Sequence, residues 1–345
     1  MAYTTINKPT DNFNTVLYTG NGGTQSITGV GHQTDFIWVK VRDGGTNYYH
    51  YLQDTVRGTQ KIIYANESSA EATITAGINT VGSDGWTTGS QGAINDSGDN
   101  FVAWNWKAGG SASSNSNGSI TSSVSANTTA GFSIVSYVGY GSNSTVGHGL
   151  GVAPKMIIVK NRDTTNGWEV YHHGIGDTKY LQLHTTAAEG TSSSRWNNTS
   201  PTNTVFTVGT ENGVNKSGSN LIAYCFAEKA GYSKFGKYIG NGNANGVFVY
   251  TGFKPAFVLQ KNAGYTSNWI LYDNKRSPIN VSDEILIANT NAAEASACDV
   301  DLLSNGFKFR AVNNASSNWD GNTYIYMAFA EEPLVGSNNI AATAR

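Results

Sequence analysis

Charged side chains are scarce in this sequence of 345 residues. Asp, Glu, Lys and Arg make up 13% of it, whereas an ordinary soluble domain contains roughly 25%. The 22 basic and 24 acidic residues are scattered and leave a net charge of −2. Because no basic tract is present to contact phosphates, nucleic-acid binding is not expected. Neutral polar surfaces can meet without desolvating charge, which suits a protein of large assemblies.

Cysteine and long apolar runs are scarce as well. Cys225 and Cys298 have no metal-ligand spacing, and Cys225 lies in an apolar run where a small core residue is expected. A chain without a disulfide framework fits folding in a reducing cytoplasm. The first residues contain no apolar signal-peptide core, and no segment reaches ~18 apolar residues. Neither export by a cleavable signal nor a membrane span is therefore expected.

Glycine and aromatic residues are abundant instead. The chain has 40 Gly, 18 Tyr and 8 Trp, and aromatic residues at this level exclude a disordered chain. Gly-containing turn dipeptides recur every eight to twelve residues and favour hairpins, because Asn-Gly and Asp-Gly adopt positive φ at low cost. These dipeptides include Asp84-Gly85, Asn166-Gly167, Asn212-Gly213, Asn245-Gly246 and Asn305-Gly306. Short strands at this interval are typical of antiparallel sandwiches.

Three copies of one short pattern organise the chain. Met156–Asp163 is an apolar run of four residues followed by Lys-Asn-Arg-Asp. Phe36–Asp43 is a near-copy, and Phe257–Asn262 is a weaker one. Short runs rich in Ile and Val are typical of buried strands, so the sequence predicts three repeats of one unit. Lys160 and Arg162 are expected to form surface ion pairs with acids of their own repeat.

Other landmarks recur in the same order in each copy. Each repeat ends in a strand that is apolar on both faces, at Phe101–Trp106, Leu221–Glu228 and Tyr324–Glu331. Such strands are expected to be central and covered on both sides. An Ala-Glu segment, where a short helix could form, precedes each closing strand, at residues 66–72, 185–189 and 289–295.

The predicted fold class is all-β, with three tandem homologous antiparallel β-sandwich or jelly-roll-like repeats and Gly/Asn-rich turns. The predicted organisation is a lead-in at residues 1–12, repeat 1 at 13–108, a flexible Ser/Gly/Asn linker at 109–130, repeat 2 at 131–230, repeat 3 at 231–333 and a tail at 334–345.

The loop Thr145–Lys155 reads Thr-Val-Gly-His-Gly-Leu-Gly-Val-Ala-Pro-Lys. Together with Ala223–Glu228, Gly231–Gly236 and Tyr326–Glu331, it resembles a poorly characterised domain family that is frequent in tailed bacteriophages, especially of marine bacteria. Members are usually labelled virion structural or tail-fibre proteins. The resemblance covers residues 13–333, although the first and third repeats keep less of the loop. It implies a virion component made in the host cytoplasm and brings no known catalytic residues.

Histidine offers the first candidate chemistry. His148 lies in the Gly-rich loop, but no helix N-terminus follows it to hold an anion, so a role in the turn is favoured. His172, His173 and His184 could ligate a metal, although adjacent residues on a strand point to opposite faces. We expect no metal site here.

Carboxylates are the second group of side chains with candidate chemistry. A glycosidase needs two carboxylic acids on opposite sides of a cleft. Two pairs of glutamates recur at matching positions of the repeats: Glu189 matches Glu294, and Glu228 matches Glu331. Repetition favours a structural role, such as capping or a bridge to Lys160 or Arg162. Calcium sites built on aspartates such as Asp301 lack a binding loop. We expect no catalytic residue and no cofactor.

Aromatic residues are the candidate ligand or interface residues, because ring faces stack on sugars. Four of them lie on strands, where filling the sandwich core is the alternative, and two sit in polar loops, where more exposure is expected. The strand residues are Trp168, Tyr171, Trp269 and Tyr272, and the loop residues are Trp196 and Trp319.

The favoured hypothesis is a non-enzymatic bacteriophage virion structural protein: a tail fibre, spike or capsid-surface decoration. Its partners would be other virion proteins and further copies of itself, with a trimer as the expected homo-oligomer. The alternative is a lectin-like adhesin that binds carbohydrate on the host surface. A polysaccharide-degrading enzyme is a third, less favoured class.

Overall fold

The structure, a computed structural model, describes residues 4–335 of the chain. The predicted tail beyond residue 335 and the first three residues of the lead-in lie outside this range. The predicted all-β class is confirmed, because strands dominate and every strand pairing is antiparallel apart from one isolated bridge. Helices among residues 4–335 are single turns, and none is long and apolar enough to cross a membrane. They are η1 (Pro9–Asp11), α1 (Gly92–Asn95), α2 (Ser193–Trp196) and α3 (Asn212–Asn215).

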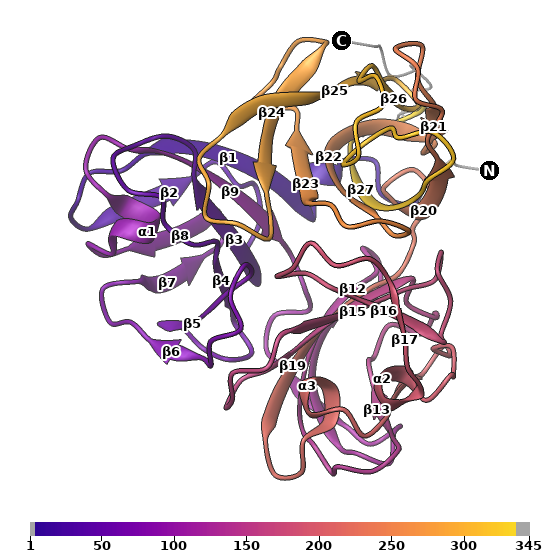
Figure 1. Ribbon diagram of the computed structural model, residues 1–345. Helices are drawn as coiled ribbons and strands as arrows, with labels where there is room; N and C mark the ends of the chain where they lie inside the picture. Colours follow the sequence, from indigo (N-terminus) through magenta and orange to yellow (C-terminus); the bar gives the residue numbers. More distant parts are fainter. Residues whose placement is uncertain (1–3, 336–345) are drawn as a thin grey trace.

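Three lobes surround a common centre in Figure 1, coloured indigo to purple, magenta to rose, and orange to yellow. We call them unit 1 (residues 13–108), unit 2 (residues 109–230) and unit 3 (residues 231–333). The main sheet of unit 1 contains, in spatial order, β1 (Phe13–Thr19), β9 (Asn100–Trp106), β3 (Phe36–Val41), β4 (Tyr51–Asp54), β5 (Lys61–Tyr64) and β6 (Ala72–Thr73). Its small sheet contains β2 (Gln25–Thr28), β8 (Gly85–Thr88) and β7 (Ile78–Gly82).

The main sheet of unit 2 has the same order with two added strands. It contains β10 (Ser113–Asn115), β11 (Ser122–Asn127), β12 (Phe132–Val138), β19 (Asn220–Phe226), β14 (Met156–Asn161), β15 (Trp168–His172), β16 (Lys179–Gln182) and β17 (Gly190–Thr191). Its small sheet pairs β13 (Ser144–Gly147) with β18 (Val205–Val208).

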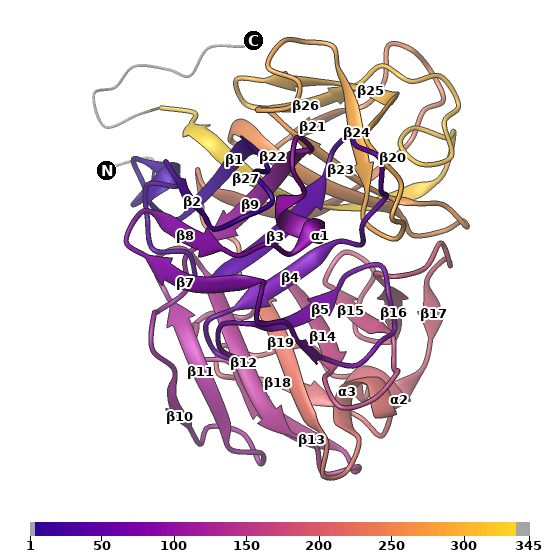
Figure 2. The same ribbon diagram turned by 90° about the vertical axis from the view of Figure 1, so that its left-hand side faces the viewer.

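The segment expected to be a flexible linker is therefore part of a sheet, and that expectation is wrong. β10 and β11 lie beside β12 in Figure 2, and β11 pairs with β12 over six residues. Backbone hydrogen bonds and the buried Val124 hold it there, neither of which a Ser/Gly/Asn-rich composition reveals.

Unit 3 joins its two layers into one continuous sheet. The order is β20 (Ser233–Ile239), β27 (Thr323–Pro333), β22 (Phe253–Asn262), β23 (Trp269–Asp273), β24 (Ser282–Ile287), β25 (Ala295–Leu303), β26 (Gly306–Phe309) and β21 (Phe248–Tyr250).

The closing strand has the same neighbours in every unit. β9 lies between β1 and β3, β19 between β12 and β14, and β27 between β20 and β22. The apolar residues on both faces of each closing strand predict this central position. The register also agrees. Phe36 pairs with Trp106 in unit 1, Met156 with Phe226 in unit 2, and Phe257 with Phe329 in unit 3.

Each main sheet is covered on both faces. One face packs on the outer strands of its own unit, which gives three separate sandwich cores. The other face contributes to a single core shared by all three units. Three rings from the closing strands meet there: Trp106 lies 6.5 Å from Phe226 and 5.8 Å from Phe329, and the two Phe rings are 6.2 Å apart. The units therefore form one body with approximate threefold symmetry inside one chain.

Shared burial makes cooperative unfolding the expected behaviour. The Phe226→Ala substitution removes a ring that is 1% exposed and should lower the free energy of unfolding by about 3–5 kcal/mol. Urea denaturation followed by far-UV circular dichroism and by Trp fluorescence should give coincident single transitions. Tyr140→Ala, at a side chain that is 56% exposed, is the control and should change stability little. Separate transitions for separate units would contradict a common core.

Candidate functional site

The two strand tryptophans lie at the junctions between units. Trp168 donates its indole N–H to the carbonyl oxygen of Tyr64 in unit 1 (2.8 Å), and Trp269 donates to that of Gln182 in unit 2 (3.0 Å). The ring of His50 occupies this position in unit 1 and reaches the carbonyl oxygen of Ile287 in unit 3 (3.0 Å). These residues are at most 1% exposed, so they are interface residues within the chain and offer no ring face to an outside ligand.

The other aromatic candidates divide between core and surface. Tyr171 and Tyr272 fill the sandwich cores of units 2 and 3. The expected exposure of Trp196 is wrong: it ends α2, is 2% exposed and packs edge-on against Tyr171. A Ser192 cap starts this turn, and the short helix turns the ring inward. Trp319 is half-buried, with its ring 4.6 Å from that of Tyr265.

The Ala-Glu segments are irregular rather than helical, and they join each unit to the next. The backbone N–H of Glu71 donates to the carbonyl oxygen of Arg162 (2.7 Å), and that of Glu189 to Ala263 (2.8 Å). The N–H of Glu294 completes the cycle by donating to the carbonyl oxygen of Arg42 (2.7 Å). The structural role expected from repetition of these glutamates is thus found between units.

A second cycle of contacts links the strands that follow the organising pattern to the closing strands. The hydroxyl of Tyr224 donates to Asp54 (2.8 Å), and the indole N–H of Trp104 donates to Asp273 (3.1 Å). His172 takes the equivalent position in unit 2 and lies 3.1 Å from the carbonyl oxygen of Tyr326. Each contact again joins two different units, so polar groups as well as apolar ones follow the threefold arrangement.

Two of the three junctions carry a charged network. The guanidinium of Arg162 binds both carboxylate oxygens of Glu71 (2.8 and 2.9 Å), and Arg57 adds a third contact at 3.2 Å. Burial alone would raise the pKa of Glu71, but the two guanidinium groups hold it below its usual value. Arg57 is itself fully buried and paired with Asp54.

The junction of units 3 and 1 repeats the arrangement. Arg42 binds Glu294 (2.8 and 3.1 Å), and the buried Arg276 joins Glu294 to Asp273. The expectation that Arg162 pairs with an acid of its own repeat is therefore wrong. Arg42, at the equivalent position of unit 1, behaves in the same way. Their partners come from a neighbouring unit.

The third junction lacks this network. Ala263 stands where units 1 and 2 have an arginine, and Glu189 pairs with Lys179 of its own unit instead. Both side chains of that pair are more exposed than Arg162 and Glu71 at the junction of units 1 and 2. The junction of units 2 and 3 consequently depends on apolar contacts and on hydrogen bonds that backbone carbonyl oxygens accept from backbone N–H groups and from side chains such as Trp269.

Three lysines of the organising pattern are buried rather than paired at the surface. Lys40, Lys160 and Lys261 are 0% exposed, and burial lowers the pKa of each ammonium group to about 8. Backbone carbonyl oxygens accept their hydrogen bonds. Lys160 and Lys261 each reach a carbonyl oxygen of the preceding unit, those of Ser68 and Thr186, whereas Lys40 donates to that of Val41 in its own unit. Lys160 and Lys261 therefore act as donors at the junctions.

The histidines considered as metal ligands have other partners. His173 reaches the carbonyl oxygen of Phe235 (3.0 Å), and His184 accepts the backbone N–H of Trp168 (3.2 Å). His148 is buried and closes its own turn by accepting from the N–H of Leu150. No group of three His, Cys, Asp or Glu side chains that could hold a metal ion occurs within residues 4–335.

The turns after β1, β12 and β20 each contain a Gly-x-Gly sequence, at residues 20–22, 139–141 and 240–242. Buried asparagines that were not singled out from the sequence hold these turns. In unit 1, Asn95 accepts the N–H of Asn21 at its side-chain oxygen and that of Gly22 at its backbone oxygen. Asn215 and Asn318 make the same contacts in the other units. Each asparagine is 0% exposed. The turns are therefore structural, and an Asn in the fourth to sixth position before each closing strand was the available signal.

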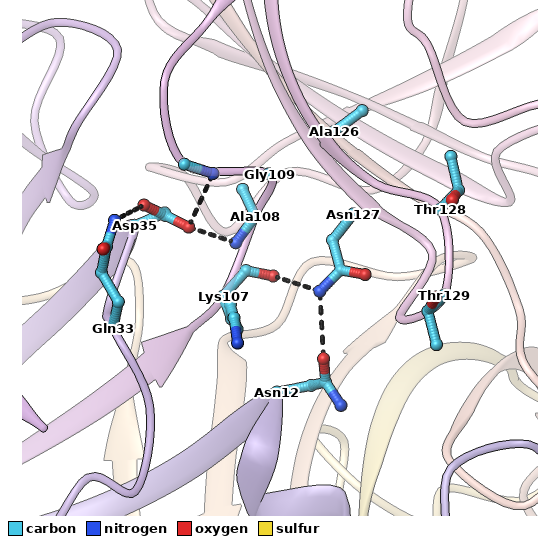
Figure 3. Close-up of a pocket in the computed structure, with 11 residues that line it drawn as sticks. Asn12, Gln33, Asp35, Lys107, Ala108, Gly109, Ala126, Asn127, Thr128 and Thr129 are labelled. Carbon is cyan, nitrogen blue, oxygen red and sulfur yellow. Dashed lines mark hydrogen bonds between the residues drawn. The ribbon is translucent and has the colours of Figure 1, made fainter. Parts of the chain in front are cut away.

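An open pocket of about 600 Å³ lies between units 1 and 2 (Figure 3). Asp35 is the only acid among its lining residues, and it accepts N–H groups of Ala108 (2.8 Å) and Gly110 (3.3 Å). Across the pocket, Asn127 donates to Asn12 (3.0 Å). Asp35 and Asn127 therefore already have hydrogen-bond partners, and their bonds stabilise the junction. The pocket offers no second carboxylate for hydrolysis.

The charged junctions predict unequal costs of mutation. Arg162→Met leaves Glu71 short of a partner in a mostly buried site, and it should lower the free energy of unfolding by about 1–3 kcal/mol. Lys179→Met removes the more exposed pair of the third junction and should cost less than about 1 kcal/mol. Urea midpoints of the two variants test this difference. Equal losses would show that burial of the networks does not matter.

Burial of histidine predicts acid lability. Burial lowers the pKa of all six histidines, that of His172 to about 3. Below pH 6.5 the histidines of the unfolded chain bind protons, whereas those of the folded chain stay neutral. The free energy of unfolding is therefore fully present above pH 6.5 and falls as the pH drops. His172 alone should cost about 2 kcal/mol at about pH 5.

Urea midpoints at neutral and acid pH measure this loss. His172→Gln, whose side chain keeps hydrogen-bonding groups but does not titrate, should reduce the loss by the share assigned to His172. An unchanged pH dependence in this variant would contradict the assignment.

Comparison with family models places this architecture. The match is a family described as a domain of unknown function (DUF7483), and it spans residues 8–333, which is all three units taken together. Comparisons with curated proteins and with solved structures returned no match. A single family model across the three units agrees with a single shared core. By this match the chain belongs to the DUF7483 family.

Proposed function

We propose that this protein is a non-enzymatic structural component of a tailed-bacteriophage virion, located in a tail fibre, a spike or a capsid-surface decoration. One observation carries the proposal: a single chain builds a closed three-lobed body whose lobes are fixed by a common core and by cyclic contacts. Such a body is a preassembled part, suited to holding other proteins at defined angles.

The use of the reactive side chains supports a non-enzymatic role. An enzyme site needs acids, bases or nucleophiles that face a substrate. Here Glu71 and Glu294 bind arginines between units, and His50 and His172 bond to backbone carbonyls of neighbouring units. Burial raises the pKa of the Cys225 thiol well above its usual value, which keeps it protonated.

The neutral surface supports contacts with other virion proteins. Charged residues are few, and many of those present are used inside the junctions. One outer face of unit 2 is lined by Ser114, Ser123 and Ser136 beside the exposed Val138. Hydroxyl faces of this kind cost less to desolvate than charged ones, provided that the partner supplies hydrogen bonds. Copies of the chain are proposed to associate through such faces, and synthesis is proposed to occur in the host cytoplasm before assembly.

A lectin-like adhesin that binds host-surface carbohydrate is the second proposal. The buried Trp168 and Trp269 no longer support it. Its support comes instead from an exposed aromatic face in unit 3, which includes Phe248 and Tyr250.

Location in the particle tests the structural role. Antibody raised against the purified chain should label intact phage particles at one defined position in immunogold electron microscopy, with a symmetric arrangement of copies. Particles purified on a density gradient should contain the chain in fixed proportion to the major capsid protein. Presence in infected-cell lysate combined with absence from purified particles would overturn the proposal.

A further inference from the structure

The outer strand pairs of the three units are equivalent, which allows their surfaces to be compared position by position. β2 pairs with β8, β13 with β18, and β21 with β26. In each pair an aromatic residue faces inward and fills the sandwich core: Trp86, Phe206 and Phe307. The registers align on these residues, so outward-facing positions correspond as well.

Unit 3 differs from the others at three outward-facing positions. Unit 1 has Ser26, Thr28 and Thr87 there. Unit 2 has Thr145, Gly147 and Thr207, of which the last two are buried, with the side chain of Asn115 lying over Gly147. Unit 3 has Phe248, Tyr250 and Lys308, which we call the β21 face. Phe248 is 43% exposed and Tyr250 is 53% exposed, so neither ring fills the core of unit 3. The other two units fold without aromatic residues at these positions.

Phe248 and Tyr250 lie on the same, exposed side of β21, the strand labelled at the right-hand margin of Figure 1, and we call their two rings the platform. They are two residues apart on a strand, so they point the same way about 7 Å from each other. Gly306 lies under the ring of Phe248, since a Cβ at this glycine would be 3.0 Å from Cε2 of the ring. Flat, exposed rings of this kind present the faces that sugar rings stack on.

A positive charge stands beside the platform. Lys308 is directly opposite Phe248 on the neighbouring strand. Its ammonium group donates to the side-chain oxygen of Asn245, and no carboxylate partner for it is found in the described part of the chain. The nearest acid across the sheet, Asp301, is bound by Arg310. The charge of Lys308 is therefore available to an anionic ligand.

We propose that the β21 face binds an acidic saccharide. Sugar rings stack on Phe248 and Tyr250, and a carboxylate of a uronic-acid unit binds the ammonium of Lys308. Amides of the neighbouring loop, such as Asn245, lie where they can bond sugar hydroxyls. The inference gives the second proposed function a site. The structural role does not depend on it, because virion location and saccharide binding are measured separately.

Isothermal titration of the purified chain with tetragalacturonate tests the proposal, with cellotetraose as the neutral comparison. One tetragalacturonate should bind per chain, more tightly than cellotetraose, and the difference should shrink when salt is raised from about 50 mM to about 500 mM. The double variant Phe248→Ser/Tyr250→Thr gives unit 3 the residues of unit 1 and should weaken binding at least about tenfold. Lys308→Thr should abolish the preference for the acidic ligand.

A transplant provides the matched gain. Ser26→Phe, Thr28→Tyr and Thr87→Lys together place the same three side chains on the equivalent face of unit 1, and the stoichiometry should rise from one to two. All substituted side chains face outward, so thermal unfolding should stay unchanged and serve as the folding control.

Three results would overturn the proposal. The first is no heat of binding at millimolar tetragalacturonate. The second is equal binding by the wild type and the double variant. The third is a lower sedimentation coefficient for the double variant than for the wild type, which would assign the rings to contact between copies of the chain.

Discussion

Burial of both faces of every main sheet is the constraint on which this structure depends. A sheet in a two-layer sandwich needs one apolar face, and a second apolar face has to be covered by something outside the sandwich. Here the second face of each sheet meets those of the other two, and Trp106, Phe226 and Phe329 occupy the point where they converge. No unit can leave without exposing its own apolar face and the faces of the other two units that it covers.

Directional contacts then fix how the units are rotated against one another. Apolar burial is non-directional and would accept several arrangements. The backbone N–H groups of Glu71, Glu189 and Glu294 donate hydrogen bonds to the next unit. These bonds allow a single arrangement of the units, because each donor must reach one particular carbonyl oxygen. The buried arginines strengthen two junctions, while Ala263 leaves the third without a guanidinium. The arrangement is thus threefold in geometry and unequal in electrostatics.

The sequence predicts strands better than it predicts what lies between them. Apolar runs and recurring turns identify the closing strands and their central position, since a two-sided apolar strand has to be covered. The sequence pattern does not show which part of the chain covers these strands. Trp168 and Trp269 therefore look like free ligand-binding residues, although they bond to neighbouring units. Unit 1 has His50 at the position of these tryptophans, and an apolar or aromatic pattern does not reveal this equivalence. Strands β10 and β11 escape detection because backbone pairing, which composition does not record, holds them.

Fusion of the three lobes into one chain has a consequence for how this surface can change. In an assembly of three identical chains, a mutation appears on every lobe at once, and a new contact is always made three times. In this chain a substitution on one lobe leaves the other two as they were, which is how unit 3 alone can carry Phe248 and Tyr250. If such a body binds on a symmetric ring, its core geometry fits three orientations, but its three lobes present different surfaces. The bound protein would then break the symmetry of the ring, because one binding surface would point in one direction only.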